Sequence, residues 1–151
     1  KYTKGKFIEV DLMKKEDWEK VEGEFNLISL IAVLHHIPDF EQRLALLKKL
    51  KQKLAKNGML VFTAWQFTDI PALKERMIPW EKYPEVDSTQ LEENDFLLDW
   101  QRGEHSIRYC HLVDRKEIDR LIEALSLTKV AQFYADGKDG KSNIYVVLKK
   151  E

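Results

Sequence analysis

The chain has 151 residues, of which 44% are hydrophobic, and its 25 basic and 26 acidic side chains leave a net charge of −1. This length and apolar content suit a single domain with one core. The near-neutral charge excludes a general attraction to nucleic acid or to an anionic membrane, so any nucleic-acid contact must be local.

Cys110 is the only cysteine in the sequence, which excludes an internal disulfide and a thiolate-rich zinc site and agrees with a reducing compartment. The longest apolar run, residues 27–34, is far shorter than the roughly 20 residues that a membrane-spanning helix needs. No signal peptide is recognisable at the start of the sequence. We therefore expect a cytoplasmic protein with no membrane partner.

The first quarter of the chain predicts two strands. The β-branched and aromatic run at 7–10, which ends at Asp11, is typical of a short strand. A brief helix is expected over residues 14–21. The almost continuously apolar run at 25–34 is typical of a strand that is buried on both faces of a parallel sheet.

A helix and a further strand are expected next. Asp39 is a candidate N-cap, and apolar residues recur at spacings of three and four from Phe40 to Leu54, which predicts an amphipathic helix. Asn57 and Gly58 are expected to end it. Residues 59–65 then predict a second buried strand, which completes a βαβ crossover with the strand at 25–34.

The second half begins with a weakly patterned segment, residues 66–103, which we interpret as an insertion or lid. An ordered segment is expected at 106–112 and a helix at about 114–125. Two strands, 128–135 and 144–148, flank a glycine-bearing turn and predict an antiparallel hairpin at the end of the chain. The whole is an α/β pattern.

Two stretches carry a resemblance to a known family. Residues 25–37 (FNLISLIAVLHHI) and 57–65 (NGMLVFTAW) closely resemble the fourth and fifth strands of class I S-adenosylmethionine-dependent methyltransferases. Residues 95–100 (DFLLDW) and 108–112 (RYCHL) look like those of the tRNA methyltransferases that esterify carboxymethyluridine at the anticodon wobble position. The resemblance covers essentially the whole chain and implies a Rossmann-like sheet, S-adenosylmethionine as cofactor, and tRNA as a partner.

The sequence also departs from that family. The family usually has aspartate where Asn26 stands, proline where Asp99 stands and often tyrosine where Cys110 stands, which leaves the methyl acceptor open. The glycine-rich turn and the ribose-binding acid of the first two strands do not occur in the sequence. The resemblance therefore implies a partial methyltransferase domain over residues 1–151, truncated at the N-terminus, which we expect to bind the cofactor weakly or not at all by itself.

Four residues are implied as cofactor contacts. Asp11 matches the position that accepts from the adenine amino group, and the backbone amide of Leu12 would bond the ring; the alternative for Asp11 is a helix N-cap or a surface acid. Ile31 and Val33 lie where the fourth strand ends beside the sulfonium arm of the cofactor. Core packing is equally compatible with both.

Three residues are expected to contact the methyl acceptor. Arg108 and His111, with Tyr109, would clamp a carboxylate, which is already deprotonated at neutral pH and needs no general base. The alternative is that Arg108 pairs with an acid of segment 66–103 and that Tyr109 belongs to the core. Trp65 and Trp100 would give a base a stacking surface, or else are simply buried aromatics.

Two further patterns have ordinary explanations. We expect no metal at His35 and His36, because neighbours on an extended segment point to opposite faces and no cysteine cluster supplies further ligands. One of the two histidines should pack beneath the strand end while the other borders the active site. The lysines of 48–56 predict a solvated helix face, with phosphate binding as the alternative.

Three functions remain open at this point. The first is methyl transfer to a tRNA wobble-uridine carboxymethyl group, the second is methylation of a small molecule, and the third is a catalytically silent partner subunit. The implied strand order also separates residues 7–10 from 25–34 by two strands. We therefore expect either that 7–10 pairs directly with 25–34, or that a second copy or another partner chain covers that open edge.

Overall fold

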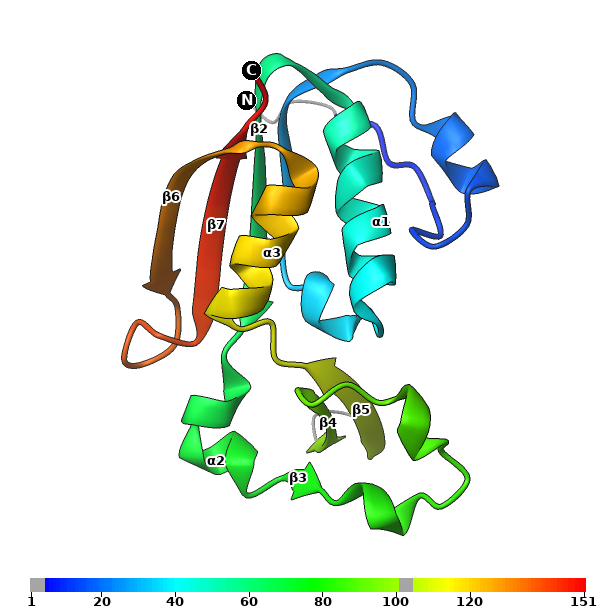
Figure 1. Cartoon of the computed structure of the whole chain (residues 1–151), viewed down its shortest axis with the longest axis vertical. Coiled ribbons are helices and arrows are strands. Elements are labelled where there is room, and N and C mark those ends of the chain that lie inside the picture. The colour runs from blue at the N-terminus through cyan, green and yellow to red at the C-terminus, as the bar shows by residue number, and fades with distance from the viewer. Residues whose placement is uncertain (1–4, 101–104) are drawn as a thin grey trace.

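The computed structural model describes residues 5–100 and 105–151, and its largest element is a four-stranded sheet in the order β1-β2-β7-β6. Its strands are β1 (Phe25–Leu30), β2 (Leu54–Trp65), β6 (Thr128–Ala135) and β7 (Asn143–Lys149). Helices α1 (Phe40–Gln52) and α3 (Arg115–Leu125) lie together on one face of this sheet (Figure 1). The fold is mixed α/β, as the sequence predicted.

The strand directions confirm the crossover and the hairpin. β1 and β2 are parallel, with Leu30 opposite Phe62, and α1 connects them. β7 runs antiparallel to both β2 and β6. The β6–β7 turn contains Gly137 and Gly140 with φ of 76° and 70°, a left-handed backbone that glycine adopts without strain. The N-cap of α1 is also as expected: Asp39 Oδ1 accepts from Glu41 N at 2.7 Å.

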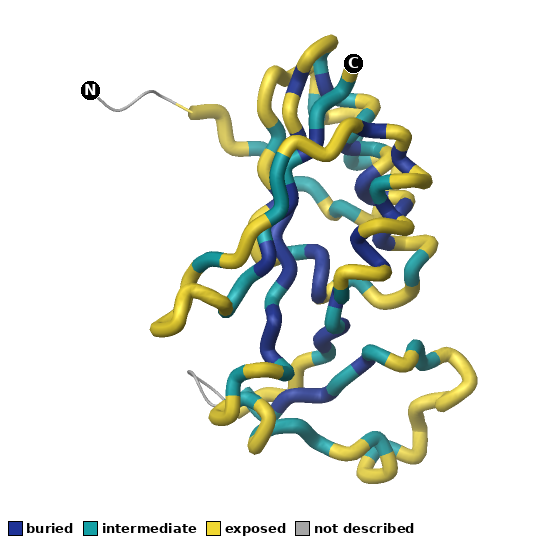
Figure 2. The backbone as a smooth tube through the Cα atoms, turned by 60° about the vertical axis from the view of Figure 1, so that its left-hand side comes forward, coloured by how far each residue is buried: buried dark blue, intermediate teal, exposed yellow. Residues whose placement is uncertain are grey.

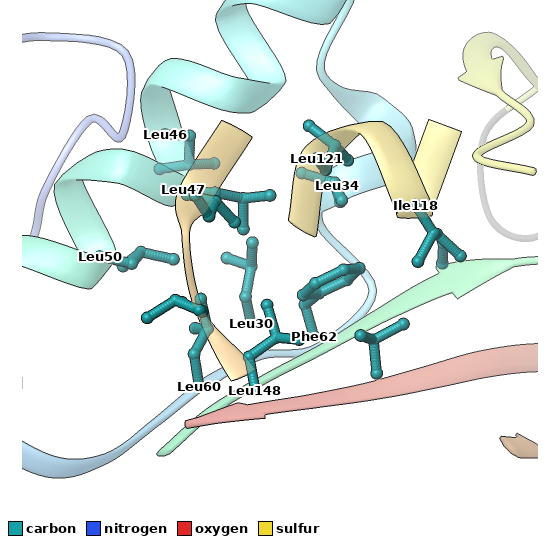
Figure 3. Close-up of a cluster of buried hydrophobic side chains, with 14 of the residues drawn as sticks. Leu30, Leu34, Leu46, Leu47, Leu50, Leu60, Phe62, Ile118, Leu121 and Leu148 are labelled. Atoms are coloured by element: carbon teal, nitrogen blue, oxygen red, sulfur yellow. The ribbon is translucent and has the colours of Figure 1, made fainter. Parts of the chain in front are cut away.

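The main core fills the space between the helices and the sheet. Leu47 of α1 and Leu121 of α3 meet Phe62 of β2 there, and all three side chains are fully buried (Figure 3). The tube in Figure 2 shows buried positions concentrated along the central strands and the inner sides of the helices. Such burial is the main source of stability in a domain of this size.

A smaller antiparallel sheet lies beyond the carboxyl end of β2 (Figure 1). It is formed by β3 (Met77–Ile78), β4 (Asp95–Trp100) and β5 (Ser106–His111). Helix α2 (Pro71–Lys74) and short 3₁₀ turns at Phe67–Asp69, Trp80–Lys82 and Ser88–Gln90 complete this part. Thus β3 and β4 fall within the segment of weak pattern, and β5 within the ordered segment expected after it.

The expected strand at 7–10 is wrong. These residues belong to no strand, and Phe7 is 89% exposed. Within residues 5–24, the only regular element is a 3₁₀ turn, Glu16–Lys20. A short apolar run forms a strand only where a partner offers backbone hydrogen bonds, and β1, an edge strand of the sheet, is not paired with it.

The strand expected at 25–34 is shorter and less buried than its apolar composition suggested. β1 ends at Leu30, and Leu34–His36 form a 3₁₀ turn. Leu27 is 57% exposed because β1 forms the edge of the described sheet and because both helices lie on the sheet face opposite to the Leu27 side chain. Helix α1 also ends at Gln52 rather than Leu54, so Asn57 and Gly58 lie inside β2.

No helix within the described residues is both long and apolar enough to cross a membrane.

Candidate functional site

A cavity of about 730 Å³ lies where the carboxyl end of β2 meets the small sheet and the β6–β7 hairpin. Its walls combine two indoles, two cations and two acids: Trp65, Trp100, Arg76, Lys138, Asp69 and Asp139. In open α/β sheets, ligands bind at the carboxyl ends of the parallel strands. The position and the size of this cavity make it the candidate binding site.

Aromatic rings form one wall of the cavity. The ring centroids of Trp65 and Trp100 are 6.3 Å apart in an edge-on arrangement. Phe67 packs against Trp65 at 5.4 Å. The guanidinium carbon of Arg108 lies 3.9 Å from the Trp100 ring centroid, a stacked cation–π contact. The two tryptophans that the sequence suggested as a stacking surface are therefore side by side, with a cation on one of them.

Strand alternation separates the three residues expected to clamp the acceptor. Successive side chains of β5 leave opposite faces of the small sheet. Arg108 leaves the same face as Trp100, whereas Tyr109 and His111 leave the other face, where both bond to Asp95. A single clamp made of Arg108, Tyr109 and His111 is therefore wrong. Arg108 alone lies beside the cavity wall.

His111 belongs to a buried ion network instead. The residue is 2% exposed, its Nδ1 lies 2.6 Å from Asp95 Oδ1, and its Nε2 lies 2.7 Å from Glu117 Oε2. Tyr109 donates its hydroxyl to the same Asp95 oxygen at 2.6 Å. Both ring nitrogens of His111 are engaged, so neither faces a ligand.

Arg43 connects this network to helix α1. Its Nε donates to Glu117 Oε1 at 2.6 Å and its Nη2 donates to Glu92 Oε2 at 2.5 Å. The Arg43 side chain has no solvent exposure. Arg43 was not among the residues predicted from the sequence, although a signal exists: it stands one helical turn before Leu47 and so shares the buried face of α1.

The network shifts the pKa values of its members. Burial alone would lower the pKa of His111, but its hydrogen bonds to Glu117 and Asp95 outweigh burial and raise that pKa. Burial would raise the pKa of Glu117, yet the bonds from His111 and Arg43 lower it. These shifts favour a charged His111 between two carboxylates.

Ligand atoms of Glu92, Asp95 and His111 lie within 4.8 Å of one another, a spacing that would suit a metal ion. Each residue already has a strong partner: Glu92 binds Arg43, and Asp95 and His111 bind each other. A metal ion there would have to displace these bonds. The arrangement is therefore better described as a network of ion pairs.

Asp11 and Leu12 lie in a surface turn rather than at the end of a strand. Asp11 is exposed, its Oδ1 accepts from Met13 N at 3.0 Å, and its backbone N–H donates to Asp17 Oδ2 at 2.7 Å. The carbonyl of Leu12 accepts from the Trp18 indole at 3.0 Å. Asp11 thus has the geometry of the surface acid given as its alternative, and its contact with adenine stays a prediction.

Ile31 and Val33 flank a sharp change of direction after β1. Ala32 between them has a φ of 56°, and its N–H donates to Thr63 Oγ1 at 2.9 Å. Val33 packs against the main core, while Ile31 is 50% exposed. Ile31 is therefore the more exposed of the two residues at the end of the strand.

Three of the lysines at 48–56 have local roles. Lys51 Nζ donates to the Leu125 carbonyl and Lys53 Nζ donates to the Val21 carbonyl. Lys49 lies over the Trp18 ring at 5.8 Å from its centroid. These contacts satisfy carbonyls and cover an apolar ring, which agrees with the structural interpretation of this face.

Comparison in sequence gives one family. The methyltransferase domain family matches residues 4–132 of the chain. No curated protein matches the chain.

Several solved structures share the fold. An S-adenosylmethionine-dependent methyltransferase from Methanosarcina mazei has a TM-score of 0.60 at 18% identity, over 85% of this chain and 60% of that one. Another, from Clostridium acetobutylicum, has a TM-score of 0.59 at 14% identity, over 85% of this chain and 59% of that one. Magnesium protoporphyrin IX methyltransferase from Synechocystis, with bound S-adenosylmethionine, has a TM-score of 0.51 at 8% identity, over 89% and 43%. The chain spans about three fifths of the length of the first two.

Proposed function

The chain belongs to the methyltransferase domain family, and we propose that it carries the acceptor side of an S-adenosylmethionine-dependent methyltransferase. The proposal is supported by family membership and by the α/β fold that it shares with solved methyltransferases. A fold does not specify a substrate, so the acceptor must be argued from the cavity.

The observation that carries the acceptor proposal is the pairing of indoles and cations at one cavity. Trp65 and Trp100 offer apolar surfaces on which a planar ring can stack. Arg108 presents its guanidinium on Trp100. The lining cations Arg76 and Lys138 are balanced in number by Asp69 and Asp139, so Arg108 is the cation that would meet a negative charge on the acceptor. A planar, negatively charged acceptor fits this combination best.

A carboxylate is the acceptor group that requires least of the protein. It is ionised at neutral pH, so no residue has to remove a proton before the oxygen is methylated. The task of Arg108 and the tryptophans is then to hold one carboxylate oxygen in line with the methyl group and to exclude water. This agrees with a site in which both ring nitrogens of His111 already bond to Asp95 and Glu117.

The cofactor would lie at the carboxyl end of β1. The half-exposed Ile31 and the turn at Ala32 leave that strand end open, which fits a ligand placed there. Ile31 and Val33 would contact the cofactor, and Asp11 and Leu12 would contact its adenine. When bound, S-adenosylmethionine supplies an electrophilic methyl group on its sulfonium.

Within this class we propose the tRNA wobble carboxymethyluridine as the acceptor. Uracil is a planar base that can stack on Trp65 or Trp100, and its carboxymethyl group supplies the negative charge that Arg108 would bind. The near-neutral net charge means that contacts with RNA would be confined to this region. A small carboxylate of similar shape is the alternative acceptor.

Binding of 5-carboxymethyluridine to the 151-residue chain tests the acceptor site without the cofactor. Nuclear magnetic resonance should show shifts of the Trp65 and Trp100 indole signals on titration, with much smaller shifts for uridine and for the methyl ester. An anticodon stem-loop RNA that carries the same base should bind more tightly, with an affinity that falls as salt is added. Equal shifts with uridine would contradict the acceptor proposal, and equal affinity for the nucleoside and the RNA would favour a small-molecule acceptor.

A further inference from the structure

The two histidines that follow β1 lie between the large sheet and the small sheet. They contact the strands that carry residues of the candidate site. The turn at Ala32, bonded to Thr63, directs the chain into the 3₁₀ turn Leu34–His36. That turn contacts both β2 and β5. The sequence predicted that one histidine would pack beneath the strand end and that the other would border the site.

His35 is the buried member of the pair. It is 3% exposed, and the backbone N–H of Trp65 donates to its Nδ1 over 3.3 Å. An N–H can donate only to a ring nitrogen that carries no proton, so His35 holds its proton on Nε2. Burial and the neighbouring His36 lower the pKa of His35 to about 3, which agrees with a neutral ring.

The position of this hydrogen bond explains why a histidine is useful there. Neighbouring amides of a strand point to opposite edges, and Gln66 N–H donates toward β7, to Ser142 O, at 2.9 Å. The Trp65 N–H therefore points toward β1, which has already ended at Leu30. His35 Nδ1 takes the place of the strand carbonyl that would have accepted this bond.

His36 makes its bond through the other type of ring nitrogen, one that carries a proton. It is exposed, and its Nδ1 lies 3.2 Å from the carbonyl oxygen of Tyr109 in β5. A carbonyl can only accept, so this Nδ1 carries the proton. The rings of the two histidines are 4.3 Å apart. One turn thus bonds to the strand end that carries Trp65 and to the strand that carries Arg108.

We propose that His35 is a positioning residue of the acceptor site, which fixes Trp65 through the bond to its amide and through contact with its indole. The two ring centroids are 5.9 Å apart, and the Trp65 indole in turn meets Trp100. The orientation of both indoles in the cavity therefore depends on an acceptor at the Nδ1 position of His35. The inference rests on the proposed function only in its description of the cavity as an acceptor site.

Three variants of the 151-residue chain test the proposal. His35→Asn can place an oxygen near the former Nδ1, whereas His35→Leu keeps an apolar group of similar bulk without an acceptor. His36→Asn is the matched control at the neighbouring, exposed position. The Trp65 amide and indole signals should move strongly in His35→Leu and stay near those of the wild type in His35→Asn. They should also stay near those of the wild type in His36→Asn, because the asparagine amide can still donate to the Tyr109 carbonyl.

The same variants are then titrated with 5-carboxymethyluridine. His35→Leu should weaken binding about tenfold, and His35→Asn by less than about threefold. If His35→Leu does not fold, His35→Gln replaces it, since its oxygen lies beyond the Nδ1 position and should also displace Trp65.

Unchanged Trp65 signals in His35→Leu or His35→Gln would overturn the proposal, as would equal displacement in His35→Asn. If the signals behave as expected but the wild type binds no 5-carboxymethyluridine, the positioning of Trp65 stands and the proposed acceptor is wrong.

Discussion

Arg43 on α1 and Glu117 on α3 form an ion pair across the helix layer, with 2.6 Å between Nε and Oε1 and no solvent exposure of the arginine side chain. Glu117 also bonds to His111 at the end of β5, and Arg43 also bonds to Glu92 ahead of β4. The two helices and the small sheet therefore share one buried set of charges. This network is one of the connections between the large and the small sheet.

Removal of the guanidinium should be strongly destabilising. Arg43→Met removes the cation that bonds both Glu117 and Glu92 and leaves the buried Glu117 with His111 as its remaining partner, so we expect the free energy of unfolding to fall by about 3–5 kcal/mol. Urea unfolding measures this loss. Arg120→Met is the control: this exposed cation stacks on Phe40 at 4.0 Å and should cost less than about 1 kcal/mol. Similar losses in both variants would contradict the role given to the ion pair.

The same network predicts how stability depends on pH on the alkaline side. The pKa of His111 is raised in the folded state from its ordinary value of 6.5, so its contribution is complete below pH 6.5 and is lost as pH rises through the folded pKa. The groups that face its ring are Asp95, Glu117 and, at 3.6 Å, Glu92. The urea midpoint of unfolding should decrease as the pH rises above 6.5. His111→Gln should flatten this part of the plot of midpoint against pH. A profile that keeps its slope in the variant would refute the assignment to His111.

On the acid side, stability is instead lost as the pH falls. The folded pKa of Glu117 is below its ordinary value of 4.5, so its contribution is present above pH 4.5 and is lost as pH falls through the folded pKa. Glu117→Gln should therefore reduce the loss of stability on acidification, and unfolding curves from pH 5 to about pH 2 would show it. An unaltered acid limb in this variant would mean that other carboxylates cause the loss.

Arg108 should matter for the acceptor and not for the cofactor. In an enzyme that contains this chain, Arg108→Ala should lower kcat/KM for the acceptor by about tenfold or more, because the cation beside Trp100 is lost, while the dissociation constant of S-adenosylmethionine stays nearly unchanged. Arg108→Lys keeps the charge without the planar fork and should recover part of the loss. A parallel loss of cofactor binding would remove Arg108 from the acceptor site.

The exposed edge of the large sheet should be a site of association. β1 is an edge strand, and Leu27 and Phe25 on it are exposed, so we propose that a second copy or a partner chain covers it. Sedimentation should detect concentration-dependent association of the chain, and Leu27→Lys should weaken it. A monomer at all concentrations, for wild type and variant alike, would rule out self-association through this edge.

Gly58 should resist substitution because of a close backbone approach. A Cβ there would lie 2.8 Å from the Ala55 carbonyl oxygen and 2.9 Å from that of Phe25. Gly58→Ala should cost roughly 1–3 kcal/mol through strain at the start of the β1–β2 pairing. Gly5→Ala, which adds a Cβ in open space, is the control for chemical unfolding. Equal stability of the two variants would show that the backbone relaxes freely.

Local sequence signals predicted the large sheet well. Asp39 and the heptad-like spacing from Phe40 located α1, and the glycines at 137 and 140 located the hairpin, because capping and turn residues act through near neighbours. The strand at 7–10 was predicted wrongly because a strand needs a pairing partner, which composition cannot reveal.

The candidate site was predictable only in part. Trp65, Trp100 and Arg108 were singled out, and Arg108 meets Trp100 from a neighbouring strand, yet the contact of Trp65 with Trp100 requires strands more than 30 residues apart to pack together. The grouping of Arg108 with His111 was wrong because it ignored strand alternation. The partners of Arg43, Glu92 and Glu117, are 49 and 74 residues away, and no local pattern connects them.

The order of the large sheet has a consequence for hydrogen exchange. β2 and β7 are flanked by strands on both sides, whereas β1 and β6 are each paired on one side only. Amide protons of β2 and β7 should therefore exchange with solvent most slowly, near the rate set by global unfolding, and outward-pointing amides of β1 should exchange through small local openings. Protection would thus decrease from the middle of the sheet toward both edges. If another chain is added, a rise in protection along β1 would show that this chain covers the β1 edge.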